Sequence, residues 1–140
     1  MHTPPCSVAL AQVMKPIPVL GTTHADHTAY NIPCTHKMSD KRIMLDYEEE
    51  TGNLILQCFS IMYYIYIPMV LIANHGSFTW GESPEKAIEN FIILEEIAKM
   101  ALFTLIIDDR TPHLRKSLIN KHYQRKHGTN AYYGQKNRNL

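Results

Sequence analysis

Three short segments of the chain combine residue types that could do chemistry. Residues 22–27 read Thr-Thr-His-Ala-Asp-His, so two imidazoles and one carboxylate that could bind metal or move protons lie within six residues. His75 follows an apolar run and precedes a glycine, a position from which a histidine can reach a metal ion. Residues 122–127 hold two histidines, an arginine and a lysine, and residues 132–133 are tyrosines that could act as acids or bases beside these cations. Spacing alone favours a strand-capping histidine at 75 and a solvated helix with an aromatic tail at 122–133, and it does not decide between a site and a hydrogen-bonded loop at 22–27.

The composition argues against several classes of partner and compartment. A formal net charge of +1 over 140 residues gives no general field that would attract nucleic acid or anionic lipid, and the basic residues between 115 and 136 are typical of a solvated helix face. The three cysteines are widely spaced and form no CxxC pair, which indicates reduced thiols rather than a disulfide framework. Residues 1–20 lack a basic start followed by an apolar run, so no secretory signal is expected and the protein should be cytoplasmic.

Residues 54–73 are mostly apolar and raise the alternative of a membrane protein. Their length alone meets the rule of about 20 residues for a span. Pro68 lies inside this run, the tyrosines at 63, 64 and 66 lie near its middle rather than at its ends, and no basic flank fixes an orientation. We therefore expect a helix, a loop and a buried strand here, and no membrane span.

The elements that must position these residues alternate between helices and strands. Helices are predicted over residues 7–14, 41–59, 84–107 and 112–127, strands over 17–20, 68–73 and 77–80, and a polar loop over 22–33. Ser83 followed by proline and glutamate is the clearest start of a helix, and Gly128 is a typical C-cap. The alternation predicts a layered α/β fold in one domain over residues 1–135, with a disordered tail over 136–140.

Burial is predicted for two of these elements. The run at 68–73 is continuous and β-prone, which is typical of a strand buried on both faces. The helix that starts after Ser83 carries apolar residues at helical spacing, so one of its faces should belong to the core. These residues are Ala87, Ile88, Phe91, Ile92, Ile97, Met100 and Ala101.

Several strings of the sequence resemble L-ribulose-5-phosphate 4-epimerases of the class II aldolase superfamily. The most specific are GTTHAD at residues 21–26 and KHYQRKHGTNAYYGQ at 121–135, and further segments agree at 47–53, 74–81 and 93–100. They follow the family's order from residue 2 to residue 135. The resemblance implies a three-layer α/β/α sandwich, a sugar phosphate substrate and assembly as a homo-oligomer, usually a tetramer. The family's amino-terminal half, with its phosphate-binding loops, would precede residue 1, so we expect a carboxy-terminal portion with an incomplete sandwich.

The resemblance also implies a divalent metal ion, most commonly zinc, held by a His-x-His pair and a later histidine. His75 matches the later ligand. With a one-residue gap, His2 matches the first member of the pair and Pro4, which has no donor atom, replaces the second. Without the gap the pair falls on Met1 and Thr3.

Three further residues match the acid and base groups of the resembled family. Asp26 matches the acid/base aspartate of the GTTHAD string. Tyr133 matches the opposite acid/base, which reaches the site from a neighbouring subunit, and His122 matches a supporting histidine beside it.

The reaction implied is the interconversion of L-ribulose 5-phosphate and D-xylulose 5-phosphate. It proceeds by metal-assisted retro-aldol cleavage of the C3–C4 bond, rotation of the aldehyde and re-formation of the bond. A class II aldolase that releases the aldehyde and a non-catalytic fragment or degenerate copy are the alternatives. Because Pro4 interrupts the His-x-His pair and the phosphate loops are missing, we expect this chain alone to have little epimerase activity.

Overall fold

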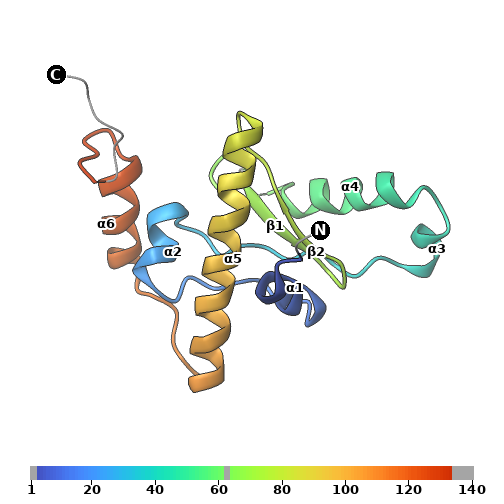
Figure 1. Ribbon diagram of the computed structural model, residues 1–140, viewed down its shortest axis with the longest axis horizontal. Helices are drawn as coiled ribbons and strands as arrows, with labels where there is room; N and C mark the ends of the chain where they lie inside the picture. Colours follow the sequence, from blue (N-terminus) through green and yellow to red (C-terminus); the bar gives the residue numbers. More distant parts are fainter. Residues whose placement is uncertain (1–2, 62–63, 134–140) are drawn as a thin grey trace.

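Within residues 3–61 and 64–133, which are the residues described, the computed structural model contains six helices and one β-hairpin (Figure 1). The pair of helices α2 and α6 lies at one end of the molecule and the pair α3 and α4 at the other (Figure 1). In chain order the elements are α1 (Pro5–Gln12), α2 (Thr22–His27), α3 (Asp40–Ile43), α4 (Tyr47–Cys58), β1 (Met69–Ile72), β2 (Gly76–Thr79), α5 (Pro84–Ile107) and α6 (Lys116–His127).

The hairpin of β1 and β2 forms the centre of the structure. The strands pair antiparallel with Met69 opposite Thr79 and Ile72 opposite Gly76. All four residues of β1 are buried, which confirms the predicted strand with two covered faces. Asn74 in the tight turn adopts a φ of 63°, a left-handed conformation that asparagine tolerates better than most residues.

The main core lies between the hairpin, α1 and α5, the long helix that crosses the front of the molecule in Figure 1. Ser83 starts α5 as predicted, because its side chain accepts a hydrogen bond from the backbone N–H of Lys86 and Pro84 occupies the first turn. Glu95 of α5 joins this helix to α1 by accepting hydrogen bonds from the N–H groups of Cys6 and Ser7 at 2.8 and 2.9 Å. The buried apolar residues of this core are Leu10, Ala11, Ile17, Ile32, Ile67, Met69, Leu71, Leu94, Ile97, Ala98 and Ala101.

A second, smaller apolar cluster joins α2 to α6. It consists of Val19, Ala25 and Ile119, with Leu114 packed against it. The N–H of Leu114 also donates to the carbonyl of Val19 at 2.8 Å. The apolar cluster between α2 and α6 is therefore small, and hydrogen bonds and ion pairs between the two helices contribute more to holding α6 against α2.

Two predicted elements differ from the structure. The segment 22–33 was expected to be a loop, but its first six residues form α2, because Ala25 is buried in the cluster just described. The single helix expected over 41–59 is divided into α3 and α4. Asp46 causes the division, because its carboxylate accepts from the N–H of Glu49 and so caps a new helix whose first turn is acidic.

Other boundaries and faces also differ. The strand expected over 17–20 is reduced to a single bridge between Ile17 and Ile32, and α6 begins at Lys116 rather than at residue 112. On α5 the predicted core face is partly wrong, because Ile88 and Ile92 are 62% and 59% exposed. The residues of α5 that are buried are Asn90, Leu94, Ile97, Ala98 and Ala101.

The described residues hold one two-stranded antiparallel sheet among helices, which is compatible with a fragment of an α/β fold, and the incomplete three-layer sandwich stays a prediction. The described part of the chain also has no helix long and apolar enough to cross a membrane. The predicted disordered tail at 136–140 lies outside the described residues.

Candidate active site

The carboxylate of Asp26 lies where α2 meets α6. The Nδ1–H of His122 donates to one carboxylate oxygen at 3.0 Å, and the Nη2 of Arg125 lies 3.3 Å from both oxygens. His122 and Arg125 are three residues apart on α6 and so share the face that meets α2. The three side chains are 17–22% exposed, so the cluster is partly withdrawn from water but can still be reached.

Tyr133 joins the same cluster through Arg125. The guanidinium of Arg125 lies 3.9 Å from the centre of the Tyr133 ring, a cation–π contact. The backbone N–H groups of Tyr132 and Tyr133 both donate to the carbonyl of Arg125, which holds the turn after α6 against the helix. Three of the predicted site residues, Asp26, His122 and Tyr133, are therefore brought together within one chain. That Tyr133 serves a neighbouring subunit stays a prediction.

Arg125 was not selected as a site residue from the sequence, although it links Asp26 to Tyr133. Its Nε is buried and has no hydrogen-bond partner among the described residues. The available signal was its spacing of three residues from His122, which places both on one helix face. Spacing alone could not identify Asp26 as their common partner.

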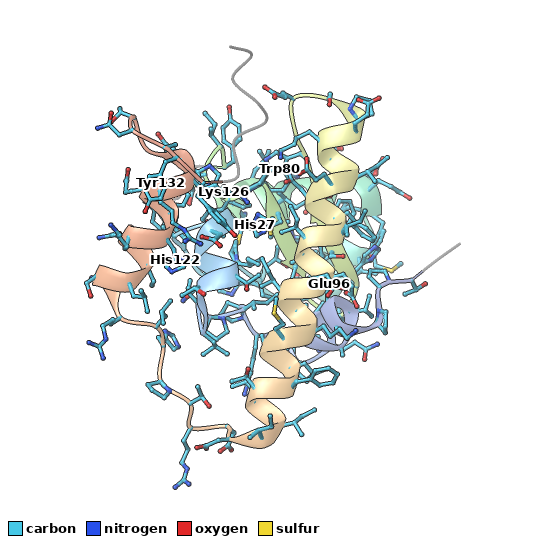
Figure 2. All side chains as sticks on the ribbon, turned by 60° about the vertical axis from the view of Figure 1, so that its left-hand side comes forward. His27, Trp80, Glu96, His122, Lys126 and Tyr132 are labelled. Atoms are coloured by element: carbon cyan, nitrogen blue, oxygen red, sulfur yellow. The ribbon has the colours of Figure 1, made fainter. Side chains whose placement is uncertain are left out.

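Within the described residues, neither histidine of α2 is hydrogen-bonded to the Asp26 carboxylate. His24 is 4% exposed and donates from Nε2 to the carbonyl of Tyr30 at 2.9 Å; burial lowers its pKa to about 4. Burial, followed by the charge of Lys126, lowers the pKa of His27 to about 4. Figure 2 shows His27 close to Lys126. Residues 22–27 therefore do not converge on one metal ion, and Asp26 is the member that meets α6.

His27 lines a polar cavity of about 460 Å³ beside the Asp26 cluster. Lys86, Tyr123, Lys126 and His127 are among the other lining residues. His127 also donates from Nε2 to the backbone carbonyl of Asp26 at 2.7 Å, so α6 contacts α2 through backbone as well as side-chain groups.

His75 lies in the turn after β1 and is exposed. Its Nδ1 is 3.2 Å from the hydroxyl of Tyr47, and its ring centre is 5.8 Å from that of Phe78. Tyr47, His75 and Phe78 line a cavity of about 280 Å³ between α4 and β2, and Asp26 is not among the lining residues. His75 and Asp26 therefore belong to two separate sites.

Residues 1–102 match the family described as Class II Aldolase and Adducin N-terminal domain. The chain belongs to the class II aldolase and adducin family. Members of this family are typically lyases or isomerases and generally use a divalent metal ion. Asp26 and His75 lie within the matched residues, whereas the three α6 and tail residues that surround Asp26 lie beyond them.

The donor atoms near His75 do not fit the metal site that class II aldolases generally use. No group of three or more histidine, cysteine or acidic side chains gathers to hold an ion in residues 3–61 and 64–133. Pro4 is buried directly before α1 and carries no donor atom, and His2 lies outside the described residues. Because zinc sites usually need three or four protein ligands, the described residues by themselves do not form one.

Proposed function

We propose that this class II aldolase-family chain carries the acid/base cluster of an L-ribulose-5-phosphate 4-epimerase, with little turnover from the chain alone. The observation that supports this most is the Asp26 carboxylate, which is held by His122 and Arg125 beside Tyr133. The proposal includes a sugar phosphate substrate, zinc as the metal ion, a homotetramer, and an α/β/α sandwich of which the described elements are one part.

The cluster suits proton transfer at a hydroxyl group. Retro-aldol cleavage requires a base that removes the proton of the hydroxyl next to the breaking C3–C4 bond, and an acid that returns it when the bond re-forms. Asp26 takes this proton on one side of the aldehyde, and Tyr133 does so on the other. His122 fixes the orientation of the carboxylate, because its Nδ1–H donates to one oxygen while Arg125 contacts both.

The expected low turnover follows from what the cluster lacks. Cleavage of the C3–C4 bond leaves negative charge on the three-carbon fragment, and this charge must be stabilised before the bond can re-form. The described residues near His75 do not complete the ligand set that the family generally uses for this purpose. Asp26 and its neighbours can move protons, but they cannot supply that stabilisation.

A class II aldolase is the second candidate, because the family match supports lyases as well as isomerases. The two reactions share the cleavage step and differ in whether the two-carbon aldehyde leaves the site. The non-catalytic alternative is supported by Pro4, since a proline cannot replace a metal ligand.

Incubation of the purified chain with zinc and L-ribulose 5-phosphate tests these candidates. Slow formation of D-xylulose 5-phosphate, followed by ¹³C NMR and lost in both Asp26→Asn and Tyr133→Phe, would support the proposal. Asp40→Asn changes an exposed acid on α3 and is the matched control, expected to behave as wild type. Release of free aldehyde would favour the aldolase. Turnover at rates usual for enzymes would contradict the expected low activity, and turnover unchanged in Asp26→Asn would rule out the acid/base assignment.

A further inference from the structure

Two of the three cysteines line one cavity. Cys6, Cys34 and Cys58 are free thiols, and each is partly buried. Cys34 and Cys58 line a cavity of about 380 Å³ between the end of α4 and residues 31–36. Cys6 lies elsewhere, on α1, where its backbone N–H donates to Glu95 of α5. The proposed chemistry uses neither Cys34 nor Cys58, so this pair of thiols has no role in the site described above.

The backbone of Cys34 is fixed beside β1. Cys34 forms a parallel bridge with Leu71, which is the third residue of that strand. The N–H of Leu71 donates to the carbonyl of Pro33 at 2.9 Å, and the N–H of Thr35 donates to the carbonyl of Leu71 at 2.9 Å. The Cys34 side chain packs against the main core. Hydrogen bonds on both sides of Cys34 therefore set its position relative to the hairpin.

Cys58 reaches the same cavity from α4. This helix packs against β1, and Figure 1 shows it running from α3 back toward the hairpin. Leu54 of α4 is 4% exposed and also lines the cavity. Cys58 is the last residue of α4 and follows Leu54 by one turn, so the two side chains share a helix face. The buried face of α4 thus carries Cys58 to the cavity that Cys34 lines.

The two thiols also influence each other electrostatically. Burial raises the pKa of Cys34 to about 11, and the charge of Cys58 adds to this effect. Burial also raises the pKa of Cys58. An influence of one thiol on the other requires that they lie near each other, which agrees with the shared cavity. Because the thiolate is the reactive form, both cysteines should react slowly near neutral pH.

We propose that Cys34 and Cys58 form a reversible disulfide that joins the end of α4 to the segment beside β1. The oxidant is a small disulfide such as glutathione disulfide. The thiolate of one cysteine attacks it, forms a mixed disulfide and releases one glutathione thiolate; the thiolate of the other cysteine then attacks the protein sulfur of the mixed disulfide and releases the second. The two protein thiols lose two electrons and two protons, and the oxidant is reduced to two molecules of thiol.

The disulfide acts on the part of the chain that it encloses. It closes a loop over residues 34–58, which contains α3 and α4. Closing a loop restricts the unfolded chain, so the oxidised protein should be the more stable form. Tyr47, at the start of α4, lies 3.2 Å from Nδ1 of His75 through its hydroxyl. Oxidation therefore also strengthens the position of the helix that contacts His75, and this inference does not depend on the proposed reaction.

Incubation of the folded chain with glutathione disulfide at mildly alkaline pH, followed by intact-mass spectrometry without reductant, tests the proposal. The wild type should lose two hydrogen atoms, keep the mass of one chain without bound glutathione, and regain the hydrogens with dithiothreitol. Cys6→Ser is the matched control and should oxidise as the wild type does. Cys34→Ser and Cys58→Ser should each stop at the mixed disulfide. Circular dichroism checks that every variant is folded.

Peptide mapping and urea unfolding complete the test. Mapping should find Cys34 linked to Cys58, and the same oxidation in concentrated urea should lose this preference, because the fold no longer holds the two thiols together. Oxidation should raise the urea midpoint of the wild type and of Cys6→Ser, and leave that of Cys34→Ser unchanged. A linkage through Cys6 in the folded chain or a disulfide between two chains would overturn the proposal. So would a folded wild type that stays reduced, or one that retains glutathione without closing the bond.

Discussion

His24 should make the helix that carries Asp26 sensitive to acid. Its imidazole is 4% exposed, and its Nε2–H donates to the carbonyl of Tyr30. Burial lowers its pKa from 6.5 to about 4, and the hydrogen bonds to the carbonyls of Tyr30 and Pro18 offset only part of that effect. Protonation therefore costs more free energy in the folded protein than in the unfolded chain.

The sign of the pH dependence follows from this lowered pKa. Above the unfolded value of 6.5 the neutral imidazole is present in both states, and the full stability is available. As the pH falls from 6.5 toward 4, the unfolded chain binds the proton first, and folding loses free energy. With a folded pKa of about 4, the loss from His24 is about 2 kcal/mol between about pH 7.5 and pH 5, and about 3 kcal/mol by about pH 4.

Urea unfolding of the wild type and of His24→Gln, followed by the fluorescence of the single tryptophan, Trp80, measures this loss. The glutamine can still donate to Tyr30 but does not titrate. Between the two pH values the variant should lose about 2 kcal/mol less than the wild type. A remaining loss is expected in both, because the pKa of His27 is also lowered. His36→Gln, at an exposed site, should behave as wild type, and equal losses in wild type and His24→Gln would refute the burial argument.

Three further perturbations follow from contacts between elements. Asp26→Asn removes the charge that His122 and Arg125 share and should lower the free energy of unfolding by about 2 kcal/mol, with faster hydrogen exchange confined to α2 and α6. Glu95→Gln weakens the acceptor at the start of α1 and should lower the free energy of unfolding by about 1–2 kcal/mol. Burial raises the pKa of Glu95, but the hydrogen bonds from Ser7 and Cys6 outweigh it and lower the pKa below 4.5. This stability is therefore lost as the pH falls below about 4.5. His75→Ala should remove whatever zinc the purified chain retains, and an unchanged zinc content by plasma emission spectrometry would contradict a role for His75 in metal binding.

Elements with local signals could be predicted from the sequence. The start of α5 depends on three successive residues, Ser83, Pro84 and Glu85, whose effects lie within one turn. The run at 68–73 contains a strand because its residues are apolar throughout, and no distant residue is needed to recognise it. The division between α3 and α4 was missed because the exposed Met44 and Leu45 continue an apolar pattern that suits a helix.

Features that depend on distant partners could not be predicted in this way. Residues 22–27 lack an apolar helical pattern, and the burial of Ala25 in α2 depends on Ile119, which is distant in the sequence. The likeness of GTTHAD to a known family identified Asp26, but the role of Arg125 depends on a contact across 99 residues of sequence. The outward side of α5 was misjudged for a similar reason, since its apolar residues lie on both sides of the helix and only packing shows which side faces the core.

Asp26 has two roles that a single substitution does not separate. The carboxylate is the proposed base and also the main polar contact between α2 and α6, so a loss of activity in Asp26→Asn could come from either role. Two other variants separate them. Arg125→Lys keeps the charge near Asp26 but loses the planar contact with Tyr133, whereas His122→Asn removes the donor that orients the carboxylate. If residual turnover falls in these variants while hydrogen exchange in α6 stays slow, orientation of the carboxylate is the cause, and if both change together, docking of α6 is.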